Sequence, residues 1–201
     1  MKQAKAKQQT ATNKAPGDVR VISGKWRGRK LPVFDAEGLR PTPDRVKETL
    51  FNWLMLHIDG AIVLDCFAGS GSLAIEALSR HANYASLIER DRKLAAHLKQ
   101  NLQRLSCSNA EVINQDCLTV LAKTAIKKYD IAFIDPPFHK NLAIACCQAL
   151  ETNGWLADNA FIYLEVEKEL NIQLIPSNWL LIKHQQAGQL AYRLYQRQNH
   201  S

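Results

Sequence analysis

The chain has 201 residues, of which 46% are hydrophobic, enough to fill the core of one domain with small additions. No apolar run approaches the length of a membrane span, and the Lys-rich residues 1–7 precede no apolar stretch of the kind found in secretory signals. The five cysteines are odd in number and lack metal-ligand spacing. We therefore expect free buried thiols, no metal site and a cytoplasmic protein.

The net charge of +7 is concentrated at one end of the chain. Residues 1–47 hold 12 Lys and Arg against 4 Asp and Glu, whereas residues 48–201 hold 14 against 15. A basic segment of this kind is typical of a surface that binds a polyanion. Residues 1–18 show no apolar periodicity, and we expect them to form a disordered basic tail.

Residues 19–32 have the pattern of two short strands about a Gly-containing turn, which predicts a β-hairpin. Trp26 lies among four cations: Lys25, Arg27, Arg29 and Lys30. Cations for phosphates beside an aromatic ring for base stacking are typical of an RNA-contacting surface. For Trp26 itself, packing against the main domain is an equal alternative.

A helix is predicted to follow, with Thr42 as its N-cap, Pro43 in the first helical position and Asp44 in the first turn. The apolar stripe of this helix is typical of a core contact. Arg40 and Arg45 flank its start, and either could bind a phosphate or a cofactor carboxylate.

Residues 61–65 read as a buried strand that ends in a turn containing Gly69 and Gly71, after which a helix begins. The spacing of Gly69, Gly71 and Ala74 also satisfies the dinucleotide-binding pattern, and Glu89 lies where a ribose-binding acid belongs. On these residues alone, NAD binding remains an alternative.

Asp65 argues against NAD, because a carboxylate at the end of this strand would repel a pyrophosphate. The ammonium and sulfonium groups of S-adenosylmethionine (SAM) would instead be attracted. The alternative is that Asp65 is a structural cap. The candidate cofactor contacts in this turn are Asp65, Phe67, Ala68, Gly69, Ser70 and Gly71.

Two further strands are predicted at residues 84–89 and 110–114, and each is followed by an acid. Glu89 could accept hydrogen bonds from both ribose hydroxyls of SAM, and Arg90 follows it. Asp116 could contact the cofactor, or it could be the N-cap of a helix over residues 118–126; both roles are compatible.

Residues 129–134 form a continuous apolar run, typical of a strand buried on both faces, and the sequence Asp-Pro-Pro-Phe follows it. The Asp135 carboxylate and the Pro136 carbonyl could accept hydrogen bonds from an exocyclic amine of a nucleobase, and Phe138 could stack on the base. This pattern suits amine methylation. The alternative is an ordinary strand end whose Asp caps the helix predicted at residues 141–151.

Strands are also predicted at residues 161–166, 179–184 and 190–195, and the last two should pair antiparallel. Alternating strands and helices predict a doubly wound α/β sheet. The four acids that follow successive strands would then surround one cofactor at the edge where the parallel strands end. These acids are Asp65, Glu89, Asp116 and Asp135.

The Asp-Pro-Pro-Phe segment resembles the [D/N]-P-P-[F/Y/W] motif of SAM-dependent amino-methyltransferases. With the N-terminal segments, the chain resembles the bacterial small-subunit ribosomal RNA guanine-N2 methyltransferase family over residues 19–195. The resemblance implies a Rossmann-like sheet of seven strands whose last strand is antiparallel, with a hairpin and helix extension at residues 19–58 and a methyltransferase domain at 59–197. It also implies that Asp116 accepts a hydrogen bond from the adenine amine of SAM, with the Cys117 N–H facing a ring nitrogen.

The partners implied are SAM and small-subunit ribosomal RNA, as naked RNA or within a partly assembled 30S particle, bound by a monomer. An adenine-N6 methyltransferase remains an alternative, although Asp135 stands where adenine enzymes often carry Asn. A non-catalytic RNA-binding module with a SAM pocket is a further alternative.

Overall fold

The computed structural model describes residues 17–33, 42–137 and 142–198. Residues 1–16 of the tail predicted at 1–18 lie outside the described residues, as do Arg40 and Phe138, whereas Asp18 is the first residue of a strand.

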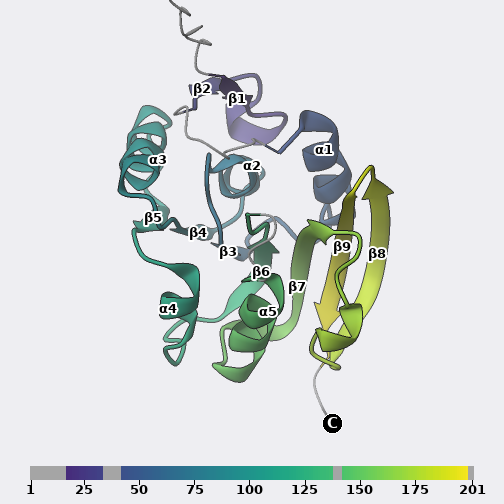
Figure 1. Cartoon of the computed structure of the whole chain (residues 1–201). Helices are drawn as coiled ribbons and strands as arrows, with labels where there is room; N and C mark the ends of the chain where they lie inside the picture. The colour runs from purple at the N-terminus through teal and green to yellow at the C-terminus, as the bar shows by residue number, and fades with distance from the viewer. Residues whose placement is uncertain (1–16, 34–41, 138–141, 199–201) are drawn as a thin grey trace, which may run out of the picture.

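One seven-stranded sheet forms the centre of the molecule, in the order β5-β4-β3-β6-β7-β9-β8 (Figure 1). The strands are β3 (Ile62–Asp65), β4 (Tyr84–Ile88), β5 (Ala110–Ile113), β6 (Tyr129–Ile134), β7 (Leu156–Glu167), β8 (Trp179–Ala187) and β9 (Leu190–Arg197). Neighbours among β3 to β7 pair in parallel, whereas β9 lies antiparallel to both β7 and β8. The predicted fold class is thus confirmed, including the reversed last strand.

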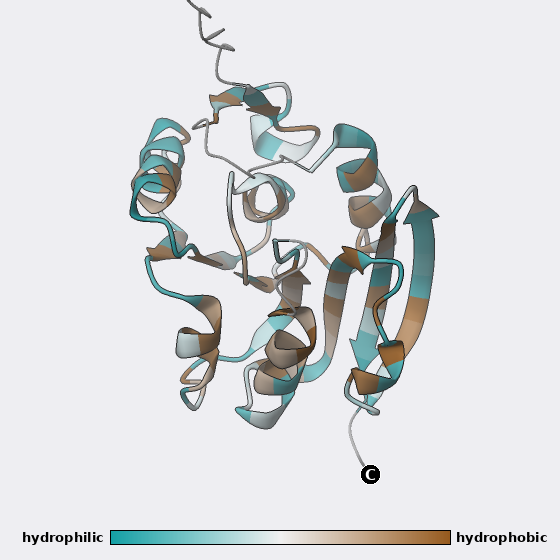
Figure 2. Cartoon of the chain, in the orientation of Figure 1, coloured by the Kyte–Doolittle hydropathy of each residue, from teal (hydrophilic) through white to brown (hydrophobic). Residues whose placement is uncertain are grey.

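Helices cover both faces of the sheet, giving three layers (Figure 1). On one face lie α1 (Asp44–Trp53), α2 (Ser72–Ser79) and α3 (Arg92–Arg104), and on the other lie α4 (Cys117–Leu121) and α5 (Leu142–Thr152). Each face has its own apolar core. On the first, Phe51 of α1 and Tyr163 of β7 both meet Phe133 of β6 edge to face. Because both faces are covered, the central strands are mostly apolar (Figure 2).

The N-terminal extension forms the predicted hairpin, with β1 (Asp18–Arg20) antiparallel to β2 (Lys30–Pro32) and a 3-10 turn, η1 (Gly24–Trp26), between them. It packs over α2 on the side away from the sheet (Figure 1). Every residue of α2 is buried. A helix that is buried all round needs cover on both sides, and the extension supplies the second side.

Buried polar groups of α2 fasten this extension. The Glu76 carboxylate, 1% exposed, accepts hydrogen bonds from the backbone N–H groups of Ile22 and Ser23 at 2.8 and 3.0 Å. The Ser79 hydroxyl accepts from the Trp26 N–H at 2.9 Å. A Cβ on Gly24, whose φ is +78°, would lie 1.8 Å from the Ser79 carbonyl oxygen. The turn therefore lies too close to α2 for any residue but glycine at this position.

Several element boundaries differ from the prediction. The N-cap of α1 is Pro43, so the prediction of Thr42 was wrong by one residue, and the Thr42 hydroxyl instead accepts from the Ser72 hydroxyl at 3.2 Å. Helix α4 ends at Leu121, well before residue 126, and β7 begins five residues before the predicted position 161. The apolar periodicity of a sequence predicts where a helix or strand lies more accurately than it predicts where that element begins and ends.

Strand β8 lies at the edge of the sheet and exposes three apolar side chains: Leu180, Leu181 and Ile182. This part of the strand is coloured hydrophobic in Figure 2. Among the described helices, none has the length and apolar content needed to cross a bilayer.

Replacing Glu76 by Ala should destabilise the protein by about 3 kcal/mol, because two buried backbone N–H groups lose a charged acceptor. The free energy of unfolding in urea, followed by Trp fluorescence, measures this change. Glu48→Ala is the control, since this exposed α1 carboxylate has no such bonds among the described residues. Equal stability of the two variants would contradict the role given to Glu76.

Candidate active site

The chain reverses its direction of travel across the sheet between β3 and β6. From β3 it runs outward to β4 and β5, then returns to β6 on the other side of β3. Ligands of open α/β sheets bind where the parallel strands end at such a reversal. The predicted acids follow the carboxyl ends of four adjacent strands: Asp65 of β3, Glu89 after β4, Asp116 after β5 and Asp135 after β6. Their predicted gathering at one edge is confirmed.

Asp65 is 2% exposed and lies at the N-terminus of α2. Burial raises the pKa of its carboxyl group to about 7, and the charge of Glu89 adds to this, while hydrogen bonds from the backbone of Ala74 and Phe67 lower the pKa. Ala74 lies in the first turn of α2, so this contribution is compatible with the alternative that Asp65 is a structural cap. The same carboxyl group lies buried at the end of β3, where this strand is paired with β6.

The glycine turn is held close to the ends of β3 and β4. Gly69 and Gly71 have positive φ angles of 52° and 77°. A Cβ on Gly71 would lie 2.6 Å from Leu98 Cδ2. The Glu89 carboxylate accepts from the Gly69 N–H at 2.9 Å and from the Asp91 N–H at 2.6 Å. The predicted ribose-binding acid therefore also fixes the glycine turn.

Asp116 is the N-cap of α4, and its carboxylate accepts from the Thr119 N–H at 3.0 Å. The structural alternative is therefore confirmed for this residue. The next side chain, Cys117, is buried and lies in a group with Cys66 and Cys146 whose sulfur atoms are all within 4.8 Å of one another. Spacing along the sequence could not predict this group, because its members come from three different elements.

Asp135 directly follows β6 and is half-buried, and Pro136 after it is buried. Burial, followed by the charges of Glu165 and Asp65, raises the pKa of the Asp135 carboxyl group well above its usual value. A carboxylate with a raised pKa binds a proton more readily than an ordinary carboxylate does.

Glu165 is a site residue that the sequence reasoning missed. It lies on β7, is 5% exposed, and accepts a hydrogen bond from the Tyr163 hydroxyl at 2.9 Å. A charged residue within the otherwise apolar run at residues 161–166 was the signal that could have identified it. Asn114 was missed as well: its amide donates to the carbonyls of Glu89 and Arg90, and so holds the end of β4.

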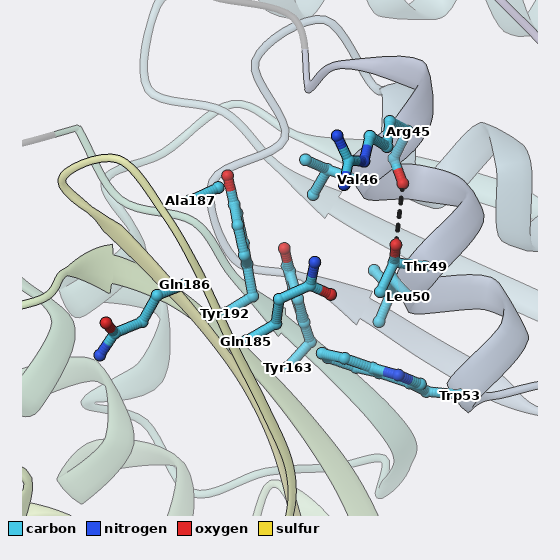
Figure 3. Close-up of a pocket in the computed structure, with 10 residues that line it drawn as sticks. All are labelled: Arg45, Val46, Thr49, Leu50, Trp53, Tyr163, Gln185, Gln186, Ala187 and Tyr192. Carbon is cyan, nitrogen blue, oxygen red and sulfur yellow. Dashed lines mark hydrogen bonds between the residues drawn. The ribbon is translucent and has the colours of Figure 1, made fainter.

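A cavity of about 310 Å³ lies between α1 and the strands β7, β8 and β9 (Figure 3). Arg45 and Trp53 line it from α1, and Tyr163 and Tyr192 line it from the sheet. Its volume is in the range of ligand-binding pockets. The predicted phosphate-binding Arg45 thus faces a cavity next to the strand that carries Glu165.

The predicted RNA contacts of the extension divide into two groups. Four cations are exposed: Lys25, Arg27, Arg29 and Lys30. Trp26, in contrast, is 6% exposed and belongs to the core above α2, with the Lys25 ammonium 4.3 Å from its ring centroid. The prediction of Trp26 as an RNA contact is corrected: the exposed side of α2 needed an apolar cover, and a buried ring offers no face to a base.

A family model described as "Conserved hypothetical protein 95" matches residues 19–196. Ribosomal RNA small subunit methyltransferase D of Escherichia coli K12 is 53% identical over 182 residues, which are 90% of this chain and 91% of that protein. The Haemophilus influenzae protein of the same name is also 53% identical, over 92% of this chain and 97% of its own length. The chain belongs to this methyltransferase family.

Solved structures agree with this family assignment. The Escherichia coli protein yhhF has a TM-score of 0.84 at 50% identity and covers 90% of this chain and 99% of its own. The Haemophilus influenzae protein HI0767 has a TM-score of 0.81 at 49% identity, over 91% and 100% of the two chains. These relatives share the whole described domain of this methyltransferase, including the N-terminal extension.

The raised pKa of Asp65 predicts a pH-dependent stability. Because the folded-state pKa of about 7 exceeds the ordinary value of 3.8, the carboxyl group favours folding most below pH 4, and this contribution is lost as the pH rises through 7. Asp65→Asn removes the ionisation. We expect the stability of this variant relative to the parent to rise by about 3 kcal/mol between pH 5 and pH 8.

Urea unfolding of both proteins at each pH, without added cofactor, measures this difference, and comparison at equal pH removes the effects of other groups. A difference that stays constant from pH 5 to pH 8 would show that Asp65 ionises normally.

Proposed function

We propose that this methyltransferase transfers a methyl group from SAM to the exocyclic N2 amine of one guanine in small-subunit ribosomal RNA. The observation that carries the proposal is the position of Asp135 and Pro136. They directly follow β6, which pairs with β3, and the end of β3 continues into the Gly69–Gly71 turn. An acceptor pair for an amine thus lies next to a turn suited to a nucleoside cofactor. The ribosomal substrate is proposed from the names of the relatives, which are ribosomal RNA small subunit methyltransferases.

The residues at the ends of β3, β4 and β5 fit SAM chemically. The absence of a Cβ at Gly69 and Gly71 gives the cofactor close access to the backbone. Asp65 is a buried anion for the cationic methionine part. Glu89 retains acceptor capacity beyond its two backbone bonds for the ribose hydroxyls. We propose that Asp116 accepts a hydrogen bond from the adenine amine of SAM. Further contacts are proposed for Phe67, Ala68, Ser70, Arg90 and Cys117.

Bound SAM supplies an electrophilic methyl group on a sulfonium sulfur. In the proposed reaction, Asp135 and the Pro136 carbonyl accept the two N–H groups of the guanine amine and align its nitrogen with that methyl group. The new N–C bond forms as the S–C bond breaks, and the surplus N2 proton passes to Asp135. The raised pKa of this carboxyl group suits it to receive the proton.

The N-terminal extension is proposed to hold the RNA. Its exposed cations would contact phosphates, and Arg45 would meet the backbone of the extruded nucleotide at the cavity mouth. Arg40 and Phe138 stay predictions for phosphate binding and base stacking. We further propose that a cytoplasmic monomer acts either on the naked RNA or on a partly assembled 30S particle.

The proposal predicts one missing methyl group in cells without the gene. Mass spectrometry of nuclease-digested small-subunit RNA should show a single N2-methylguanosine in the parent strain that disappears on deletion and returns when the gene is restored. The purified protein with labelled SAM should restore the same methyl group on naked RNA or on 30S particles from the deletion strain. Loss of methyladenosine instead would favour the adenine alternative, and transfer to neither RNA nor particle would favour a non-catalytic RNA-binding module.

Asp135→Ala should lower the rate of methyl transfer by about 10²- to 10⁴-fold, because the amine loses both its orienting acceptor and its proton acceptor. SAM affinity, measured by calorimetry, should stay largely unchanged. Asp59→Ala is the matched control, since this exposed carboxylate lies at the opposite edge, just before β3. Full turnover by the Asp135 variant would remove this residue from the mechanism.

A further inference from the structure

Glu165 occupies the position next to Asp135 in the sheet. Ile134 of β6 is paired with Leu164 of β7, so the residues that follow them are neighbours across the parallel pair. Both point to the face covered by α1 to α3, because Phe133 and Tyr163, two residues earlier, belong to the core on that face. On the other side, Glu165 is paired with Tyr192 of β9.

The Glu165 carboxylate is buried with much of its hydrogen-bonding capacity unused. It is 5% exposed and accepts a hydrogen bond from the Tyr163 hydroxyl. Within the described part of the chain it forms no ion pair. An ionised carboxylate has about four acceptor sites, and the Tyr163 hydroxyl takes one of them. Glu165 can therefore accept a further hydrogen bond from a donor that a ligand supplies.

The Watson–Crick edge of guanine carries such a donor. Its N1–H lies beside the N2 amine and points in the same direction, whereas N1 of adenine is an acceptor. We propose that Glu165 accepts the N1–H of the target guanine while Asp135 and Pro136 hold the N2 amine, so that Glu165 selects guanine over adenine. This inference rests on the proposed function and names the residue that determines its base specificity.

The electrostatics of the pair agree with this role. The charge of Glu165 raises the pKa of Asp135, and burial raises the pKa of Glu165 itself. Two neighbouring carboxylates repel each other, and the N–H donors of a guanine edge relieve that repulsion. An adenine would instead place the lone pair of its N1 against the ionised Glu165 carboxylate, and this repulsion costs binding energy.

Tyr163 positions Glu165 through its hydroxyl group and lines the cavity described above. In Figure 3 its ring lies beside that of Tyr192, with Arg45 across the cavity. A base extruded from RNA could reach the two carboxylates along this cavity. The aromatic rings offer apolar surface to the base, while Arg45 offers a positive charge to its phosphate.

The test compares guanine with 2-aminopurine at the target position of the RNA, introduced by ligating a synthetic segment. 2-Aminopurine keeps the 2-amine, but its N1 carries no proton. The parent enzyme should prefer guanine. Glu165→Gln should lower kcat/KM for guanine by about 10- to 100-fold, because a charged acceptor is lost. Its amide can donate to N1 of 2-aminopurine, so the preference for guanine should shrink by at least the same factor.

SAM affinity should be unchanged in Glu165→Gln, and Glu169→Gln, an exposed neighbour on the connector after β7, should behave as the parent. If Glu165→Gln retains the parental preference for guanine, the proposal is overturned. If this variant does not fold, the Tyr163→Phe variant tests the proposal instead. Its preference for guanine over 2-aminopurine should fall by about 3- to 10-fold, and an unchanged preference would equally overturn the proposal.

Failure of the proposed function gives a different result. In that case the parent enzyme itself would methylate adenine or no base at all, before any variant is compared.

Discussion

Buried negative charge at the edge where the parallel strands end is the constraint on which this molecule depends. Asp65, Asp135 and Glu165 come from three neighbouring strands on the same face of the sheet. Burial is the largest cause of the raised pKa of each carboxyl group. Such an arrangement opposes folding unless donors or cations compensate it. The backbone of Ala74 and Phe67 partly offsets the burial of Asp65. In the proposals above, the N–H donors of a guanine edge would compensate the other two residues.

The N-terminal extension is linked mechanically to this edge through α2. The same helix begins at the glycine turn with Gly71 as its N-cap and holds the extension through Glu76 and Ser79. With eight residues, all buried, α2 has little freedom to shift between its two neighbours. The exposed cations of the extension are therefore held at a fixed position relative to the cofactor turn. This coupling suits an enzyme that must place one nucleotide of a large RNA accurately.

The sequence was most informative where backbone geometry and polarity change together. An apolar run that ends in an acid, or in Gly-x-Gly, predicts both a buried strand and the residue exposed at its end, and all four predicted acids follow adjacent strands. It was least informative where tertiary packing decides. A Trp among cations is compatible with RNA stacking or with a core, and only the uncovered side of α2 explains why Trp26 is buried. Likewise, strand alternation could not show that Glu165 neighbours Asp135, because register is a long-range property.

The exposed cations of the N-terminal extension lie on a different segment from the acids of the sheet edge, and this separation has a consequence for recognition. Acids at the sheet edge would repel an RNA backbone, so a duplex could not lie directly across them. The proposed RNA-binding cations are on the extension and at Arg45, on other elements than the strands whose ends carry the acids. RNA phosphates are then attracted to the rim, and only a neutral base that has left its helix gains from entering the acidic interior. Under the proposed function, the charge layout as well as shape would therefore discriminate against undistorted RNA.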